Sequence, residues 1–186
     1  MTTSPTLYLL AGGNGAGKST FYRQQLAPHD IVFVNADEIA KLLDNGNSKS
    51  RDQIAWELAN KQRDQLLEQG KTFAYETVFS HHSKLDVIRD AQAGGHHVTV
   101  IYIHLSDPQL NVARVKNGYQ AAERHDVPEE KIVERLKRVP GHLKKAIELA
   151  DDAIVYDNSS ADEPFVLVAQ YEAGVLVKGE TPPWLI

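Results

Sequence analysis

A short glycine-rich segment near the amino terminus has the residue types and the spacing of a phosphate-binding loop. Its members are Gly12, Gly13, Asn14, Gly15, Ala16, Gly17, Lys18, Ser19 and Thr20. Glycines let the backbone N–H groups of such a loop turn toward one anion, and a following helix adds the positive end of its dipole. Lys18 supplies a mobile positive charge for the outer phosphates, and the Ser19 hydroxyl can join the ligands of Mg²⁺. The segment is therefore predicted to bind ATP together with Mg²⁺.

Two further candidate sites follow apolar runs farther along the chain. Asp37 comes just after the apolar run at residues 31–34, and Glu76 with Thr77 comes after another at residues 72–75. Because ligands bind at the carboxyl ends of parallel strands, Asp37 is expected across the crevice from the glycine-rich loop. There its carboxylate can orient a hydroxyl toward the last phosphate, and Glu76 can reach Mg²⁺-bound water or a substrate hydroxyl. The alternatives are that Asp37 caps the next helix and that Glu76 caps the segment after its strand.

The elements that must position these residues are indicated by alternating apolar and helix-period segments. Strands are predicted at residues 7–10, 31–34, 72–75, 98–103 and 153–156, and helices at residues 20–26, 38–43, 51–68 and 83–93. Near-continuous apolar runs indicate strands that are covered on both faces, as in a parallel sheet. The pattern predicts an α/β, three-layer fold of the P-loop NTPase and kinase type, with a mainly parallel five-stranded sheet. Residues 165–171 and 174–178 predict an added β-hairpin at the carboxyl terminus, and residues 1–186 are expected to form a single domain.

Two helical segments carry more detailed expectations. In the segment at residues 51–68, one stripe is formed by Ile54, Leu58, Gln62 and Leu66. In the segment at residues 131–145, a basic face is formed by Lys131, Arg135, Arg138 and His142, and a separate apolar stripe by Ile132, Leu136, Leu143 and Ile147. The pair Pro140-Gly141 is expected to break or kink this helix. We interpret residues 114–145 as a basic, lid-like region that faces the phosphates, and the alternative is an ordinary solvated helix face.

Composition narrows the classes of function. The net charge is −5 and the isoelectric point is about 5.9, so the surface as a whole does not indicate binding to nucleic acid or to a membrane. No stretch approaches the roughly 20 apolar residues of a membrane-spanning helix, and the amino terminus lacks the pattern of a secretory signal. The chain has no cysteine, which excludes disulfides and permits a reducing compartment. A cytoplasmic location is expected.

The chain resembles the zeta-toxin-like kinases, which are P-loop proteins of bacterial toxin–antitoxin systems, and in particular their compact chromosomal branch. The resemblance rests on several short segments that occur in the family's order. They are residues 11–20, 34–37, 75–77, 113–115, 125–129 and 156–159, together with Arg135 and Arg138. This set of markers is far more specific than the glycine-rich loop alone, because many unrelated functions share that loop.

The resemblance implies a fold related to the nucleoside and small-sugar kinases, and it implies roles for individual residues. The implied catalytic residues are Lys18, Asp37, Arg114 and Arg124; the implied substrate residues are Asp37, Glu76 and Thr77; and Arg135, Arg138 and Asn158 join the loop in binding the nucleotide. The family's activity is the ATP-dependent phosphorylation of UDP-N-acetylglucosamine at the sugar 3′-hydroxyl, and an antitoxin protein holds the toxin inactive. A nucleotide-sugar acceptor and an antitoxin are therefore the expected partners.

The chain departs from the family pattern in the basic region. Relatives often have Gly-Gly-His where this chain has Glu123-Arg124-His125. Which of Arg114, Arg124, Arg135 and Arg138 meets the γ-phosphate therefore stays open. Two other functions also stay open: a nucleotide-dependent regulatory ATPase or switch, and a non-toxic housekeeping kinase of a sugar or nucleoside.

Overall fold

The structure, a computed structural model, describes residues 4–43, 48–114 and 129–186. Its strands are β1 (Thr6–Gly12), β2 (Val32–Val34), β3 (Phe73–Thr77), β4 (His97–His104), β5 (Asp152–Asp157), β6 (Val166–Glu172) and β7 (Val175–Gly179). They form one sheet in the order β2-β3-β1-β4-β5-β6-β7. The five strands from β2 to β5 in this order are parallel, and β6 and β7 are antiparallel additions. The predicted parallel sheet is confirmed, and the hairpin extends that sheet to seven strands.

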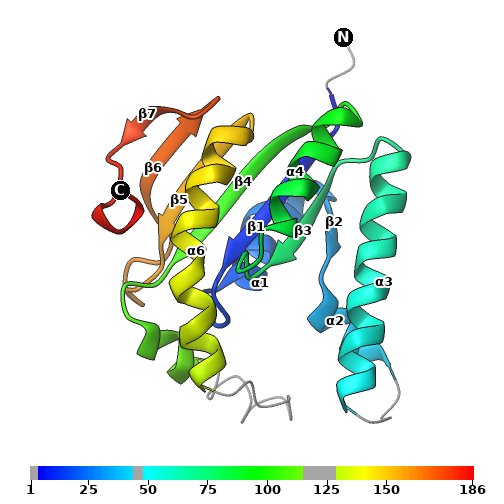
Figure 1. The fold of residues 1–186 in the computed structure, drawn as a ribbon, viewed down its shortest axis with the longest axis horizontal. Helices are drawn as coiled ribbons and strands as arrows, with labels where there is room; N and C mark the ends of the chain where they lie inside the picture. The colour runs from blue at the N-terminus through cyan, green and yellow to red at the C-terminus, as the bar shows by residue number, and fades with distance from the viewer. Residues whose placement is uncertain (1–3, 44–47, 115–128) are drawn as a thin grey trace.

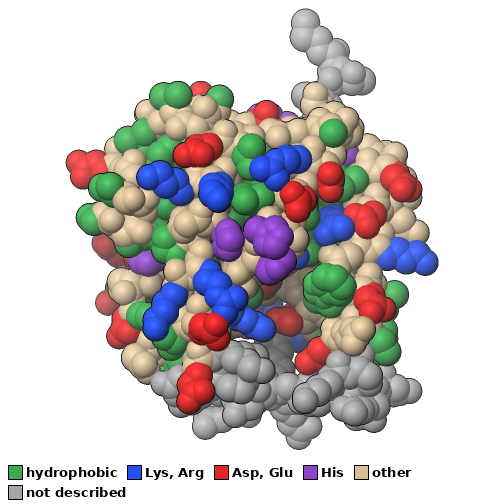
Figure 2. Space-filling view, viewed as in Figure 1, with side chains coloured by type: hydrophobic (Ala, Val, Ile, Leu, Met, Phe, Trp, Pro, Cys, Tyr) green, Lys and Arg blue, Asp and Glu red, His purple; other side chains and the backbone are tan. Residues whose placement is uncertain are grey.

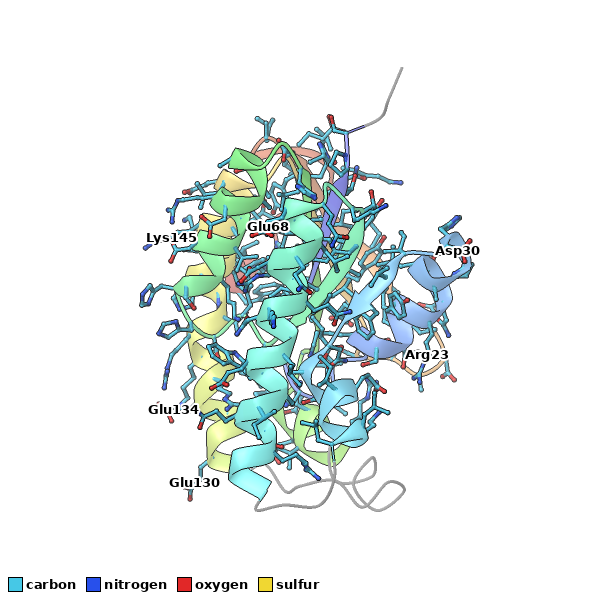
Figure 3. All side chains as sticks on the ribbon, turned by 90° about the vertical axis from the view of Figure 1, so that its right-hand side faces the viewer. Arg23, Asp30, Glu68, Glu130, Glu134 and Lys145 are labelled. Atoms are coloured by element: carbon cyan, nitrogen blue, oxygen red, sulfur yellow. The ribbon has the colours of Figure 1, made fainter. Side chains whose placement is uncertain are left out.

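Helices cover both faces of this sheet. They are α1 (Lys18–Phe21), which continues into a π-helical turn (Tyr22–Leu26) and a 3₁₀ turn (Ala27–His29), then α2 (Ala36–Leu42), α3 (Ser48–Glu68), α4 (Ser83–Ala93), α6 (Glu129–Leu149) and a final 3₁₀ turn η3 (Pro183–Leu185). Residues 108–114 are also helical. Helices α3, α4 and α6 lie on one face, and α1 with its following turns lies on the other (Figures 1 and 3). The three-layer architecture expected from the sequence is confirmed.

The core explains why the strands are apolar at nearly every position. Alternate residues of β1 point to opposite faces of the sheet. Leu7 and Leu9 enter the apolar cluster on the face of α4 and α6, and Leu10 enters a second cluster with Phe21 of α1. All three leucines are fully buried. A strand with solvent on one face would need polar residues at alternate positions, so these runs require both helical layers.

The stripe expected on α3 is buried only in part. Leu66 packs against the main core, but Ile54 and Leu58 are exposed, whereas Ala55 and Ala59 are almost completely buried. Helix α3 lies beside α2 and β2 at the edge of the sheet (Figure 1). The apolar stripe was therefore a poor guide to the orientation of α3 at residues 54–59, because the most buried positions there are alanines outside the stripe.

The expected break at Pro140-Gly141 was also wrong. Helix α6 runs without interruption from Glu129 to Leu149, with Pro140 inside it (Figure 1). Proline lacks the N–H that would bond to the carbonyl one turn earlier. Val139 and Leu143 flank this position and are fully buried in the main core. Their burial anchors the helix on both sides of Pro140, which offsets the lost hydrogen bond.

The sheet brings the candidate residues to one edge. All five parallel strands end at the same edge, and the glycine-rich loop follows β1 there. Strand β3 lies between β1 and β2, with Leu10 opposite Glu76 and Val34 opposite Tyr75. Glu76 is therefore adjacent both to the strand that carries the loop and to the strand that leads to Asp37. Asp37 itself follows β2, two strands away from β1.

The continuity of α6 predicts the effect of adding a methyl group at Gly141. A Cβ there would meet no atom within 4 Å, and the residue does not have a positive φ. Gly141→Ala is expected to raise the free energy of unfolding by about 0.5–1 kcal/mol, because alanine loses less backbone entropy in a helix. Denaturant unfolding measures this change.

Gly95→Ala is the matched control. A Cβ at Gly95 also meets nothing within 4 Å, but this residue has a φ of +82°. The same substitution there is expected to lower the free energy of unfolding by about 1–2 kcal/mol. A Gly141→Ala protein as unstable as Gly95→Ala would contradict the continuous helix.

Candidate functional site

The glycine-rich loop forms a turn with unpaired backbone donors. Gly15 and Gly17 have φ values of +78° and +101°, which residues other than glycine rarely adopt. Gly17 is the N-cap of α1. Within the loop, the Ala16 N–H donates to the Gly13 carbonyl at 3.1 Å. Among the described residues, the N–H groups of Gly15 and Gly17 have no acceptor. Unpaired N–H groups in a loop at the start of a helix can form an anion-binding concavity.

Lys18 is folded back over this loop. Its Nζ donates to the carbonyl oxygens of Gly12 and Gly13, each at 3.0 Å, and lies 3.4 Å from Glu76 Oε1. The side chain is only 6% exposed. Phosphate oxygens are stronger acceptors for an ammonium group than neutral carbonyls are. The lysine is thus held within reach of an anion in the loop, with partners that it can exchange.

Glu76 connects the loop to the next candidate residue. The Ser19 hydroxyl donates to Glu76 Oε2 at 3.0 Å, and the Asn35 side-chain amide donates to the same oxygen at 2.8 Å. The other carboxylate oxygen faces Lys18. The structure therefore brings three predicted site residues together, Lys18, Ser19 and Glu76. It adds Asn35, which the sequence did not single out as a site residue.

The oxygens at this point fit a magnesium ion. Mg²⁺ binds hard oxygen ligands and takes few of them from the protein, with phosphate and water supplying the rest. The Ser19 hydroxyl and the Glu76 carboxylate provide such oxygens directly beside the anion-binding turn. Ser19 is the predicted ligand, and Glu76 is placed to hold either the ion or a water bound to it.

Asp37 lies in the first turn of α2 with an exposed side chain. Its backbone N–H donates to Asn35 Oδ1 at 2.8 Å, and Asn35 is the N-cap of the helix. The interpretation of Asp37 as the helix cap is therefore wrong, and α2 begins at Ala36. Among the described residues, the Asp37 carboxylate has no hydrogen-bond or ion-pair partner. It is thus available to a ligand, while the asparagine before it does the capping.

Thr77 shapes the chain after β3. Its hydroxyl accepts a hydrogen bond from the Phe79 N–H at 3.2 Å, and Phe79 is fully buried with a φ of +64°. The threonine is itself 8% exposed. In this structure its side chain stabilises the turn from β3 toward α4. A substrate contact by Thr77 stays a prediction.

The four candidate arginines are distributed over two helices and an intervening segment. Arg114 ends the helical residues 108–114, and Arg135 lies on α6. Arg124 lies outside the described residues, as does most of the first half of the lid-like region. Arg138 pairs with Glu134 on an exposed part of α6, one turn earlier. The pairing of Arg138 matches the alternative of a solvated helix face.

His142 lies on the same face of α6 as Arg138, and two further histidines lie close to it. His142 lies near His81 and His82, which precede α4, and Figure 2 shows the clustered histidines between basic side chains. Burial lowers the pKa of His142, and the charges of Lys145, the two histidines and Arg138 lower it further. His142 therefore adds less positive charge to this face than a solvent-exposed histidine would. No group of three or more His, Cys, Asp or Glu side chains within residues 4–43, 48–114 and 129–186 is placed to hold a metal ion.

Two buried asparagines from the second half of the chain contact the loop. Asn158 Nδ2 donates to the Ala16 carbonyl at 2.8 Å, and Asn111 Nδ2 donates to the Asn14 carbonyl at 2.7 Å. Asn158 was predicted to bind the nucleotide, and here its amide is engaged with the loop itself. Asn111 was missed, because a single asparagine in a helical segment carries no sequence signal.

An open groove of about 770 Å³ lies elsewhere, between α3 and α4. At this groove, Tyr75 and Arg63 both donate to Asn60 Oδ1, and Lys84 donates to the Tyr75 hydroxyl. The lining residues carry charges of both signs and include none of the loop. This groove is therefore separate from the anion-binding turn.

Comparison with solved structures identifies the class of fold. The chain superimposes on a chain of the AvrRxo1-ORF1:-ORF2 complex, solved with ATP, with a TM-score of 0.76 at 17% identity, covering 94% of this chain and 60% of that chain. The PezAT chromosomal toxin–antitoxin system of Streptococcus pneumoniae gives 0.72 at 16% identity, covering 91% and 73%. A gluconokinase from Sinorhizobium meliloti gives 0.54 at 14% identity, covering 86% of each chain. The fold is that of the P-loop kinases.

The family follows from the sequence itself. The model of the Zeta toxin family matches residues 1–163, and the chain belongs to this family. No curated protein sequence matches it significantly. The chain spans about 60% of the length of the chain that it matches in the AvrRxo1-ORF1:-ORF2 complex. No helix in the described parts of the chain has the length and apolarity needed to span a membrane.

His104, at the carboxyl end of β4, provides a test of the electrostatics at this edge. Its ring stacks on Trp184 at 4.2 Å, and burial lowers its pKa below the usual 6.5 while the charge of Asp157 opposes that shift. The unfolded chain then binds more protons than the folded one as the pH falls through 6.5 and below. The free energy of unfolding is therefore expected to fall over that range through His104.

An NMR titration of the His104 ring measures this pKa. Asp157→Asn keeps an oxygen for the Ser159 N–H and removes the charge, so it is expected to lower the pKa of His104 further. A pKa at or above 6.5 in the unaltered protein would show that the ring is solvated and that the packing on Trp184 is wrong.

Proposed function

We propose that the chain is an ATP-dependent kinase that transfers the γ-phosphoryl group to a hydroxyl of a small molecule. The observation that carries this proposal is the hydrogen-bonded connection from the loop to α2. It runs from Lys18 and Ser19 through Glu76 to Asn35, whose side chain fixes the N–H of Asp37. A cation and unpaired N–H groups stand at one end of the connection, and an unpaired carboxylate stands at the other. Those are the groups that phosphoryl transfer to an alcohol requires.

Each residue has a role that follows from its position. The loop from Gly12 to Thr20 holds the phosphates, and Lys18 stabilises charge on the oxygens of the transferring group. Asp37 orients the acceptor hydroxyl and takes its proton late in the transfer. Mg²⁺, when bound at Ser19, neutralises phosphate charge. Glu76 holds the loop in register with Asn35.

Positive charge near the γ-phosphate must also come from arginine. We propose Arg114, Arg124, Arg135 and Arg138 as the candidates. Arg135 is favoured on α6, because the neighbouring Leu136 side chain approaches within 2.6 Å of the position a Cβ would take on Gly13. Helix α6 therefore reaches the loop at this turn. Arg138 is paired with Glu134, so this ion pair must break before Arg138 can contact the γ-phosphate.

The acceptor that we propose is a nucleotide-sugar such as UDP-N-acetylglucosamine, bound by Glu76, Thr77 and Asp37. Membership in the Zeta toxin family supports this choice. We further propose that the whole chain acts as one kinase domain in the cytoplasm, as the toxin of a toxin–antitoxin pair. The fold shared with the PezAT system supports the antitoxin as a partner.

A phosphotransfer screen tests the reaction. Purified protein is incubated with Mg²⁺ and ATP against UDP-sugars, nucleotides and small sugars, and products are read by the added mass of a phosphoryl group. A phosphorylated UDP-sugar supports the proposal. Phosphorylation of a free sugar or nucleoside alone would instead indicate a housekeeping kinase, and ATP hydrolysis that ignores every acceptor would indicate a regulatory ATPase.

Asp37→Asn is expected to reduce the rate of phosphotransfer by at least about a hundredfold and to leave ATP affinity unchanged, because it removes the base without touching the loop. Lys18→Ala is expected to lower both the rate and ATP affinity, the latter about tenfold or more. Calorimetry and the product assay separate these effects. Asp86→Asn, a matched change in the first turn of α4, serves as the control. Full activity of Asp37→Asn would remove Asp37 from the mechanism.

The toxin role predicts the behaviour of cells that produce the protein. Induced expression is expected to arrest growth, and expression of Asp37→Asn at the same level is expected to leave growth normal, because the effect requires phosphotransfer. Colony counts after induction and immunoblots of protein level measure this. Arrest that persists with Asp37→Asn would point to a toxic effect of folding or of ATP sequestration, and normal growth with the unaltered protein would favour a housekeeping kinase.

A further inference from the structure

The carbonyl groups of the loop are held from outside by two side-chain amides. Asn111 is 1% exposed and donates from Nδ2 to the Asn14 carbonyl at 2.7 Å. Asn158 is 7% exposed and donates from Nδ2 to the Ala16 carbonyl at 2.8 Å. The two asparagines come from the helix at residues 108–114 and from the end of β5. They therefore bond to alternate peptide groups of one loop.

Apart from these bonds to the loop, the side-chain amides of the two asparagines make few hydrogen bonds with the described residues. Asn111 Oδ1 is buried and has no hydrogen-bond partner among the described residues, so the bond to Asn14 is the interaction that orients this side chain. Asn158 Oδ1 accepts a long hydrogen bond of 3.4 Å from the Phe165 N–H. A carbonyl oxygen can accept but not donate, which fixes Nδ2 as the atom facing the loop in both cases. Buried amides that satisfy one end at the loop point to a role there.

The loop also makes room for these amides. A Cβ added to Gly13 would lie 2.6 Å from Asn111 Nδ2, and a Cβ added to Gly17 would lie 2.6 Å from Asn158 Nδ2. Gly17 needs its glycine for its positive φ as well, but Gly13 does not have a positive φ. The close approach of Asn111 and Leu136 therefore gives a physical reason for glycine at position 13.

Holding a carbonyl fixes the direction of the next N–H. In a trans peptide the C=O and the N–H lie in one plane and point in opposite directions, and the described chain has no cis peptide. The bond from Asn111 therefore turns the Gly15 N–H away from Asn111, and the bond from Asn158 turns the Gly17 N–H away from Asn158. Neither of these two N–H groups has an acceptor among the described residues. A hydrogen bond to a carbonyl also strengthens the N–H of the same peptide as a donor.

We infer that Asn111 and Asn158 are positioning residues that clamp the loop, so that the N–H groups of Gly15 and Gly17 are set to receive the oxygens of a polyphosphate. They act through the backbone and do not touch the nucleotide base. The inference rests on the proposed nucleotide site. It gives Asn111, which the sequence did not mark, a role in holding the loop. It changes the role of Asn158 from contact with the nucleotide to support of the loop.

Binding of inorganic tripolyphosphate and of ATP tests the clamp. Tripolyphosphate probes the loop without the adenine, so the two ligands separate a loop effect from an adenine contact. Asn111→Ala and Asn158→Ala are each expected to weaken the binding of both ligands by about three- to tenfold, with an unchanged circular dichroism spectrum. Isothermal titration calorimetry well below the unfolding temperature measures this. Asn111→Leu and Asn158→Leu, which keep the branching of the side chain without a donor, replace any alanine variant that fails to fold.

Asn60→Ala is the matched control. It removes a partly buried asparagine that bonds to Tyr75 and Arg63 far from the loop, so it is expected to alter stability but not the affinity for either ligand. Unchanged tripolyphosphate affinity in both clamp variants would overturn the inference while leaving the nucleotide site intact. Loss of ATP affinity alone in Asn158→Ala would show that Asn158 contacts the adenine and is not part of the clamp. Failure of the unaltered protein to bind either ligand would overturn the proposed function, and the clamp with it.

Discussion

The carboxylate of Glu76 joins the phosphate loop to the strand that leads to Asp37. It is 12% exposed and receives hydrogen bonds from Ser19 and Asn35 while facing the ammonium group of Lys18. A carboxylate taken out of water is unfavourable unless it is paired and hydrogen-bonded, and here both oxygens have partners. The order of the sheet makes this possible, because β3 lies between the strand of the loop and the strand of Asn35. The spacing between the cation and the exposed carboxylate of Asp37 thus depends on one side chain.

The polar groups at the same edge of the sheet are oriented by hydrogen bonds within the protein. Asn35 caps α2 with one end of its amide and bonds to Glu76 with the other. Asn111 and Asn158 bond to carbonyls on the outside of the loop. Groups that are already oriented need little rearrangement when charge develops near them, and this lowers the cost of binding and of catalysis. Three asparagines therefore contribute to the site without carrying any charge of their own.

Features that are encoded by residues close together in the sequence could be predicted from it, whereas features that depend on contacts between distant residues could not. The loop was recognisable because its chemistry is encoded in consecutive residues, and the parallel strands because both of their faces are buried. The face of α3 was misjudged at residues 54–59, since the buried residues there are Ala55 and Ala59 and not the larger apolar side chains. Pro140 was expected to break or kink a helix that continues to Leu149. The contact between Asn111 and Asn14 spans 97 positions in the chain, and no local pattern announces it.

The resting position of Lys18 has a consequence for how binding responds to salt. With 6% exposure and three protein oxygens around it, this ammonium group already has partners within the protein, which an incoming polyphosphate would replace. Its gain on binding is a change of partner inside the protein, which dissolved ions screen weakly. The ionic-strength dependence of nucleotide affinity should therefore report on the exposed arginines and the solution magnesium, and hardly at all on the lysine that lies nearest to the phosphates.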